Sequence, residues 1–446
     1  MLVLLLTVDC LRHDYVNKSN NCTPAITALC ESSHLFANAY ATGGRTPYSF
    51  PSILGSYYRI SQPCNKFPVN KTSVAKVFQD VGFRTIGVQA ANPYLAPYFN
   101  YDSGFDEFED FMATSRDSKE VNPSEFFRRN RRTFIRTFID WSKALLLNEL
   151  PGIHASKIVS FAIERLKSVK KGNDIFLWTH LMDTHASFTP PREFLKAQTS
   201  SVTYWKSLIR AKKVYSRKCV SKIKDLAIIK ELYLACIRYV DDNFKRLFAW
   251  LKEEGWYDDA IIIVTSDHGE SFMEHGYFEH PPQSLYNEQV QIPLIIKLPG
   301  QKKHKTHVER VSHIDLFPSV FSYLNIQVPS DFCGKGDLFY PNHRKNPIFA
   351  CGGTGDTPWK KTACIHGNWK LISEYKPSGI EAHELYNLAA DPQEKINQLG
   401  KMGEKASELV GLTLDFWATF KVQEARRDDI ENEVIERRLK ALGYMD

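Results

Sequence analysis

The stretch Ile261-Ile262-Ile263-Val264-Thr265-Ser266-Asp267-His268-Gly269-Glu270 decides the fold of this 446-residue chain. Its apolar, β-branched half predicts a strand buried on both faces, which is typical of parallel sheets covered by helices. The polar half begins where the strand ends, and in open α/β sheets ligands bind at the carboxyl ends of the strands. Asp267 and His268 offer a carboxylate oxygen and an imidazole nitrogen, so we predict that they bind a divalent metal.

Strand-like and helix-like segments alternate along most of the chain, which predicts an α/β fold with a mostly parallel sheet sandwiched by helices. The expected strands are 2–8, 35–41, 84–89, 175–179, 260–265 and 293–297, and the expected helices are 23–30, 73–81, 158–167 and 226–253. The basic segments 112–152 and 204–224 interrupt this alternation. Each is either a lid or a surface for an anionic partner or, as we favour, an amphipathic helix with a solvated basic face.

The last quarter of the chain differs from the rest in its residue pattern. From about Pro329, turn residues become frequent, and short strand candidates lie at 348–350, 363–366 and 370–373. They predict a small antiparallel subdomain followed by a charged terminal helix. We therefore expect an α/β domain over residues 1–327 and a C-terminal subdomain over residues 328–446.

Composition limits the class of protein. The chain is 43% hydrophobic and 24% charged, and its formal charge of +6 is too mild to favour binding to nucleic acid. Residues 1–8 are too few to span a bilayer and lack the basic flank and cleavage site of a signal peptide. We therefore expect a cytoplasmic protein with no membrane anchor. Nine cysteines without Cys-x-x-Cys spacing predict free thiols.

Two further segments bring polar residues to the same edge of the predicted sheet. The strand at 2–8 ends at Asp9, which adds a second carboxylate to the proposed metal site. The sequence Gly43-Gly44-Arg45-Thr46-Pro47 predicts a helix start with Thr46 at the N-cap and Pro47 after it. A hydroxyl there lies in the positive field of the helix, and a coordinated cation would turn it into a nucleophile. The alternative for Thr46 is a plain helix cap.

Two loops supply histidines. One carries His180 and His185, of which His185 is our choice to contact an ester oxygen or protonate a leaving group, whereas His180 suits a hydrogen-bonded core position. The loop 274–280 carries His275 and His280, which bind the metal, contact the substrate or lie in a polar surface loop. Together these elements predict one pocket for metal-assisted attack on the ester of a tetrahedral anion.

These residues lie in blocks that resemble the sulfatase family of the alkaline phosphatase superfamily, in order and from end to end. The blocks are 7–12, 23–29, 36–42, 47–54, 182–185, 265–270, 285–288, 292–296, 385–392 and 439–444. The resemblance implies an alkaline-phosphatase-like fold, a divalent cation and a hydroxyl-type nucleophile. It also implies a covalent sulfo- or phospho-enzyme intermediate and hydrolysis of the sulfate or phosphate esters of small molecules, glycans or lipids.

The resemblance also assigns roles by motif matching. Asp9, Asp267 and His268 take metal-ligand positions. Thr46 lies within one residue of the family's nucleophile, and we add it as nucleophile and metal ligand because of its helix-start position. The catalytic positions are Thr46, His185 and His280, and the substrate-binding positions are Arg45, His185 and His280. The Asp-His pair resembles that of the phosphonate monoester hydrolase and lipoteichoic-acid-synthase-like branches, some of which use an unmodified Thr. The imidazole ligand favours Mn²⁺ or Zn²⁺ over Mg²⁺ or Ca²⁺.

The chain departs from the family pattern in two places. It lacks the Cys/Ser-x-Pro-x-Arg pentapeptide whose first residue is oxidised to formylglycine, so we expect Thr46 as an unmodified nucleophile, with Ser49 in reserve. Arg45 is the nearest substitute for the missing Arg. In the opening motif, Cys10 replaces the usual second Asp.

We expect a hydrolase, and two alternatives stay open. The covalent intermediate would pass to a sugar or lipid hydroxyl in a transferase, but family transferases of this type are usually membrane-anchored. A degenerate member would bind anions without catalysis, which Cys10 and the missing Arg favour. The unmodified hydroxyl favours phosphate esters over sulfate esters.

Overall fold

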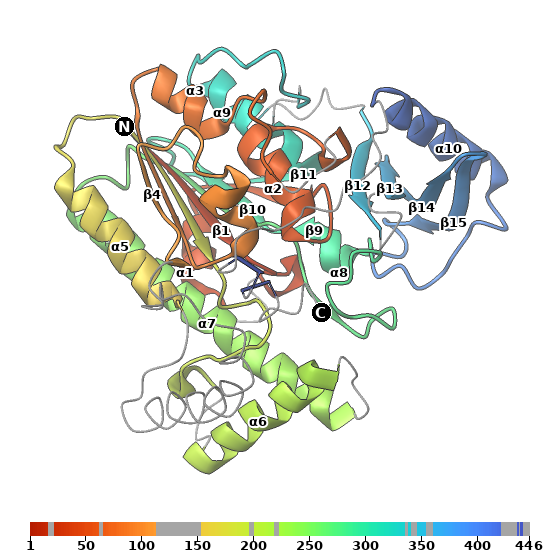
Figure 1. The fold of residues 1–446 in the computed structure, drawn as a ribbon, viewed down its shortest axis with the longest axis horizontal. Coiled ribbons are helices and arrows are strands. Elements are labelled where there is room, and N and C mark those ends of the chain that lie inside the picture. Colours follow the sequence, from red (N-terminus) through yellow and green to blue (C-terminus); the bar gives the residue numbers. More distant parts are fainter. Residues whose placement is uncertain are drawn as a thin grey trace, which may run out of the picture.

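The computed structural model describes residues 1–16, 22–61, 66–112, 153–195, 200–217, 223–334, 338–339, 346–353, 360–420, 435–436 and 438–439. Its centre is a nine-stranded sheet with the order β11-β2-β10-β6-β1-β5-β3-β4, in which β9 pairs with β2 (Figure 1). The strands are β1 (Leu2–Val8), β2 (His34–Tyr40), β3 (Arg84–Gln89), β4 (Glu107–Glu109), β5 (Ile175–Leu181), β6 (Ile261–Ser266), β9 (Gln291–Ile292), β10 (Leu294–Lys297) and β11 (Lys305–Ser312). The fold is α/β with a mostly parallel sheet, as predicted.

The middle of the sheet sets the position of the site. Strand β1 lies between β5 and β6 and runs parallel to both, with Val8 opposite Leu181 and Ser266. All residues of these three strands are buried, which explains their continuous apolar sequences. Because the three strands end level with one another, the residues that follow them meet at one edge.

Helices cover both faces of the sheet. They are α1 (Pro24–Cys30), α2 (Thr46–Gly55), α3 (Val74–Asp80), α5 (Ala155–Ser168), α6 (Ser201–Arg217), α7 (Ile223–Glu253), α8 (Asn287–Val290) and α9 (Leu316–Tyr323). Leu4 and Leu6 belong to the core cluster with α1, α5 and α7, whereas Val3 and Leu5 belong to the one with α2, α3 and α9. This alternation is the two-residue period of a strand buried on both sides.

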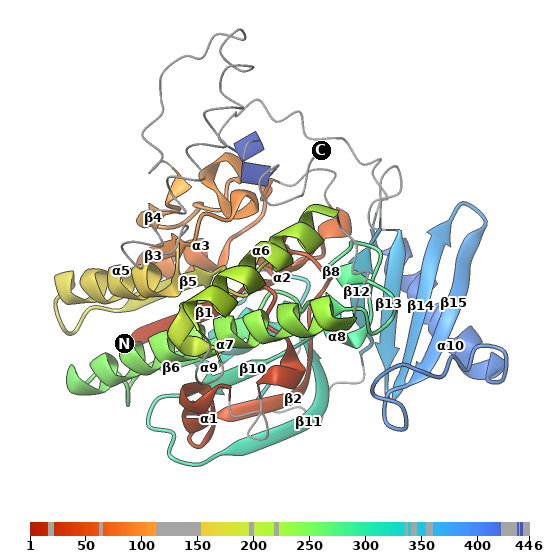
Figure 2. The same cartoon turned by 90° about the horizontal axis from the view of Figure 1, so that it is seen from below.

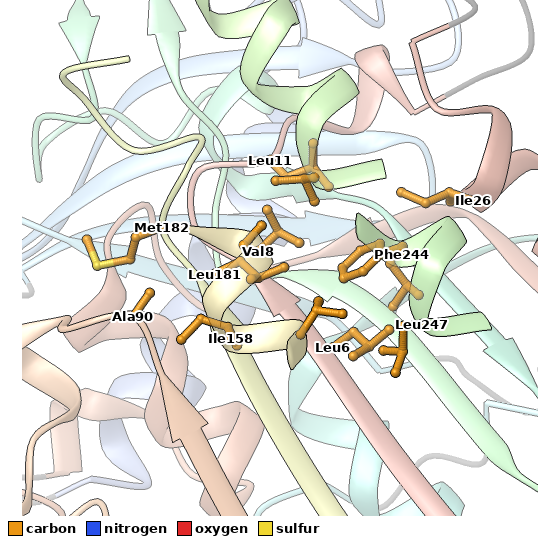
Figure 3. Close-up of a cluster of buried hydrophobic side chains, with 14 of the residues drawn as sticks. Leu6, Val8, Leu11, Ile26, Ala90, Ile158, Leu181, Met182, Phe244 and Leu247 are labelled. Carbon is orange, nitrogen blue, oxygen red and sulfur yellow. The ribbon is translucent and has the colours of Figure 1, made fainter. Parts of the chain in front are cut away.

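The packing on the first of these faces can be followed in two views. Figure 2 shows α5, α6 and α7 together in front of the sheet. Figure 3 shows Leu6 and Val8 of β1 directed toward Phe244 and Leu247 of α7, with Leu11 close by. This core fixes β1 against α7, so the turn that starts at Asp9 leaves the sheet from a rigid base.

A second, antiparallel sheet packs beside the first. It has the order β12-β13-β14-β15, and its strands are β12 (Ile348–Gly352), β13 (Lys361–His366), β14 (Trp369–Lys376) and β15 (Gly379–Asn387). Helix α10 (Gly403–Ala418) lies on it, away from the central sheet (Figure 1). A short hairpin of β7 (Ser271–Phe272) and β8 (Phe278–Glu279) follows the decisive β6 motif.

The structure differs from the sequence predictions in several details. The strand expected at 293–297 forms as β10 but runs antiparallel to β6, and β11 was not predicted. Helix α5 begins at Ala155, three residues before the predicted start. Helix α2 begins at Thr46 with Arg45 as its N-cap, because the backbone of Arg45 is extended and that of Thr46 is already helical; the predicted N-cap was therefore wrong by one residue.

Of the two basic segments, the second forms α6 over its first part, whereas residues 113–152 and 218–222 lie outside the described residues. Within the described part of the chain, no helix combines the length and the apolar character that crossing a membrane requires.

Candidate active site

Three predicted site residues meet where β1 and β6 end and α2 begins. The hydroxyl of Thr46 donates to Oδ2 of Asp267 at 2.9 Å and lies 3.4 Å from Oδ2 of Asp9. All three side chains are fully buried. Burial and the charge of Asp9 raise the pKa of Asp267 to about 8. Two carboxylates this close to one hydroxyl repel each other unless a proton or a cation lies between them.

His268 completes a donor set that fits a divalent cation. Its Nδ1 lies 2.8 Å from the carbonyl oxygen of Gly269, to which it donates, so Nε2 is the nitrogen with the lone pair. This Nε2 is buried without a hydrogen-bond partner and lies 3.5 Å from Asp267 Oδ2 and 3.9 Å from Asp9 Oδ1. An imidazole lone pair facing two carboxylates and a hydroxyl is the arrangement expected of metal ligands. The residues therefore fit the cation that the sequence predicts.

Two residues that the sequence predictions did not assign to the site hold Asp9 in place. Asn92, which follows β3, donates from Nδ2 to Asp9 Oδ2 at 3.0 Å. His180, expected in the core, has Nε2 3.3 Å from the same oxygen, while its Nδ1 lies 3.0 Å from the hydroxyl of Thr7. The available signals were a polar residue just beyond β3 and a histidine next to the last residue of β5, since both strands end at this edge.

The paired glycines allow α2 to reach the carboxylates. A Cβ on Gly43 would lie 2.4 Å from Cβ of Tyr48 and 2.7 Å from the carbonyl oxygen of Cys351. Ser49, the reserve nucleophile, donates to the carbonyl oxygens of Gly43 at 2.8 Å and Arg45 at 3.2 Å. The hydroxyl of Ser49 therefore stabilises the turn before α2, whereas the hydroxyl of Thr46 faces the carboxylates of Asp9 and Asp267.

His185 and His280 lie together beside this set. Their ring centroids are 5.0 Å apart, and that of His280 is 4.8 Å from that of His268. Burial lowers the pKa of His185 to about 4 and that of His280 well below its usual value. Both imidazoles are thus neutral near pH 7. Glu270, quoted in the motif but given no role, has Oε2 3.2 Å from Nδ1 of His280, and burial raises its pKa to about 7.

The other predicted residues take different positions. Arg45 is half-buried at the N-cap of α2, and its positive charge contributes to the lowered pKa of His268 and His280. His275 stacks on Tyr286 and has Nδ1 2.7 Å from Glu288 Oε1. His275 therefore stabilises its loop through Tyr286 and Glu288.

Comparisons with known proteins give the family and the fold. The sequence model of the family described as Sulfatase matches residues 2–326. The N-acetylglucosamine-6-O-sulfatase of Bacteroides thetaiotaomicron is 30% identical over 201 residues, which cover 40% of this chain and 34% of that protein. The matched segment thus spans about a third of this curated relative.

Two solved structures share the fold. One, in complex with its substrate D-glucosamine-2-N,6-O-disulfate, has 18% identity and a TM-score of 0.72, covering 96% of this chain and 99% of the other. The phosphonate monoester hydrolase of Silicibacter pomeroyi has 18% identity and a TM-score of 0.71, covering 95% and 96%. At these identities the likeness shows the fold alone.

Proposed function

This chain belongs to the sulfatase family, and we propose that it is a metal-dependent hydrolase that cleaves sulfate or phosphate esters through a covalent intermediate on Thr46. The observation that carries the proposal is the hydroxyl of Thr46 at 2.9 Å from Asp267 and 3.4 Å from Asp9, at the first residue of a helix. A helix start favours the anionic ester, and buried carboxylates favour the loss of the hydroxyl proton.

The first step is attack by Thr46 Oγ1 on phosphorus or sulfur. Asp267 orients the hydroxyl through the hydrogen bond, and the proton of the hydroxyl passes to solvent as the new bond to oxygen forms. A divalent cation held by Asp9, Thr46, Asp267 and His268 would lower the pKa of the hydroxyl and neutralise charge on the ester. Mn²⁺ or Zn²⁺ suits this mixture of oxygen ligands and one nitrogen. Arg45, one residue before Thr46, contributes a positive charge to the same anion.

The second requirement is a proton for the leaving oxygen. His185 and His280 contact the ester in this proposal, and His280 passes on a proton that Glu270 holds. The pKa of Glu270, about 7, suits a group that gives up and regains a proton near neutral pH. Water then cleaves the Thr46 ester, and the same groups act in reverse order.

Two sets of observations favour different substrate classes. The relative in Bacteroides thetaiotaomicron and the glucosamine disulfate complex support a sulfated sugar. The phosphonate monoester hydrolase neighbour and the unmodified hydroxyl of Thr46 support a phosphorus ester. An alkoxide nucleophile without formylglycine favours the second.

A substrate panel combined with intact mass spectrometry tests the proposal. The Mn²⁺-loaded protein is assayed with an aryl sulfate, an aryl phosphate, an aryl phosphodiester and an aryl phosphonate monoester. We expect turnover of at least one, and an adduct on a peptide containing Thr46 whose mass identifies a phospho or sulfo group. Ser49→Ala is the matched control and should keep the adduct. Metal-bound protein that turns over none of the four and carries no adduct would contradict the proposal.

A further inference from the structure

A second group of metal-ligating side chains adjoins the first site. The sulfur of Cys10 and one ring nitrogen each of His185 and His280 all lie within 4.8 Å of one another. The three side chains come from the turn after β1, the loop after β5 and the residue after β8, and all are buried. The fold thus brings together one sulfur and two nitrogens that are remote in sequence.

The chemistry of this group differs from that of its neighbour. Asp9, Thr46 and Asp267 offer oxygen, whereas a thiolate and two imidazoles are ligands that prefer Zn²⁺ over Mg²⁺ or Mn²⁺. We propose that Cys10, His185 and His280 form a second metal site that binds Zn²⁺ and that its occupation blocks the active site.

The distances support a zinc site of ordinary size. Zinc bonds of about 2.0 to 2.3 Å in a tetrahedron set the ligand atoms about 3.3 to 3.8 Å apart. Cys10 Sγ lies 3.6 Å from His280 Nδ1, so this pair already has the required spacing. Glu270 Oε2 is 3.2 Å from the same nitrogen, and zinc would replace the hydrogen bond between them. Three protein ligands leave a fourth position for water or an anion.

Zinc binding requires one proton to leave. The Cys10 thiol donates to Asp9 Oδ1 at 3.0 Å, so it carries its proton in the cation-free protein. As the sulfur–zinc bond forms, that proton passes to solvent. At Nδ1 of His280 zinc replaces the hydrogen bond from Glu270, which keeps its proton, so the imidazole stays neutral and contributes its lone pair. Asp9 Oδ1 loses a hydrogen bond at the same time and stays available to the first site.

The consequence for activity rests on the proposed function, whereas zinc binding does not. In that proposal His185 and His280 contact the ester and move a proton to its leaving oxygen. A zinc ion that occupies their lone pairs removes both roles and fills the space next to His268. Zinc at the second site therefore lowers turnover while the first cation stays bound.

The experiment measures metal content first. Protein loaded with Mn²⁺ and freed of excess metal is titrated with Zn²⁺, and both metals are quantified by mass spectrometry. We expect the total metal content to rise from about one to about two ions per chain, whether or not Zn²⁺ also replaces Mn²⁺ at the first site. Cys10→Ser and His280→Gln should each weaken zinc binding by about 100-fold. Cys364→Ser, which alters a buried thiol of the C-terminal sheet, is the control and should not.

A spectroscopic signature separates ligation from a structural effect. Co²⁺ in place of Zn²⁺ should give a sulfur-to-cobalt charge-transfer absorption that Cys10→Ser abolishes and Cys364→Ser retains. A total metal content that stays at about one ion per chain, or uptake of a second ion that neither Cys10→Ser nor His280→Gln alters, would overturn the second site. Bound zinc that leaves turnover unchanged would overturn its blocking role. Failure to bind Mn²⁺, or absence of turnover before zinc is added, counts against the proposed function instead.

Discussion

The hydroxyl of Thr46 lies 2.9 Å from Oδ2 of Asp267, although 221 positions separate the two residues in the chain. They meet because α2 begins and β6 ends at the edge where β1 also ends and presents Asp9. A helix start and two strand ends converge on one hydroxyl, which connects the topology of the sheet directly to the proposed chemistry.

Replacement of Thr46 by Ala should reduce turnover by about 10³-fold or more, because it removes the nucleophile while three metal ligands remain. Bound Mn²⁺ should fall far less than turnover. Thr46→Ser is the control, since it keeps the hydroxyl and should keep measurable activity. Steady-state kinetics with any substrate that the wild type cleaves, together with metal analysis, measures both effects. Normal turnover by Thr46→Ala would remove Thr46 from its proposed role.

Metal affinity should rise with pH up to about pH 8. The pKa of Asp267 in the cation-free protein is raised to about 8, so its carboxyl is protonated at lower pH and must lose that proton to bind a cation. The apparent affinity for Mn²⁺ should therefore increase about tenfold per pH unit between pH 6 and pH 8 and then level off. Calorimetry in buffers of different ionisation enthalpy should also detect about one proton released at pH 7. An affinity that is flat over this range would be inconsistent with a shared proton in the Asp9–Asp267 pair.

Asn92→Ala should weaken metal binding by about 10- to 100-fold without abolishing it. Asn92 donates to Asp9 Oδ2 at 3.0 Å and thereby orients a carboxylate that binds the cation. Asn38→Ala is the matched control, because Asn38 makes a single side-chain to backbone bond on an exposed part of β2. Mn²⁺ titrations of both variants measure the difference. Equal affinities would show that Asp9 needs no support from Asn92.

The buried strands were predictable because their sequences are continuous apolar runs with polar ends. β1 and β3 have the predicted bounds for this reason. β11 was missed because it is an edge strand with exposed and half-buried residues such as Lys305 and Glu309, and it has no apolar run. The antiparallel direction of β10 was also missed, since direction depends on the path of the chain between β6 and β10 and not on either sequence.

The site was predictable where a functional residue directly follows a strand, as Asp9, Asp267 and His268 do. Asn92 is likewise a polar residue that follows β3, but the two alanines between the end of β3 and Asn92 obscured this pattern. The role of Glu270 depends on a contact with His280 across the β7–β8 hairpin, which no spacing rule indicates. The cluster of Cys10, His185 and His280 was missed for the same reason, since its members are far apart in the sequence and meet only in the folded chain.

A buried ion pair of the C-terminal subdomain contacts the site-bearing domain through Asn287. Lys370 Nζ on β14 lies 2.7 Å from Glu394 Oε1, and both side chains are fully buried. Lys370 also donates to Asn287 Oδ1 at 3.0 Å, and the backbone N–H of Asn287 donates to Glu394 Oε2 at 2.6 Å. Asn287 begins α8, a few residues beyond His280. The Lys370–Glu394 pair therefore holds the loop between His280 and Asn287 against the second sheet.

Lys370→Met should lower the free energy of unfolding by about 3 to 5 kcal/mol, because it leaves the Glu394 carboxylate buried without its counter-ion. Lys370→Met with Glu394→Gln should recover most of this loss, since the amide is neutral and its oxygen still accepts from Asn287. Urea denaturation followed by circular dichroism measures both variants. Burial alone already raises the pKa of Glu394, so a carboxylate without Lys370 will take up a proton more readily, and the single variant should lose less stability at pH 5 than at pH 8. A double variant as unstable as the single one would mean that Lys370 contributes through packing of its stem and not through its charge.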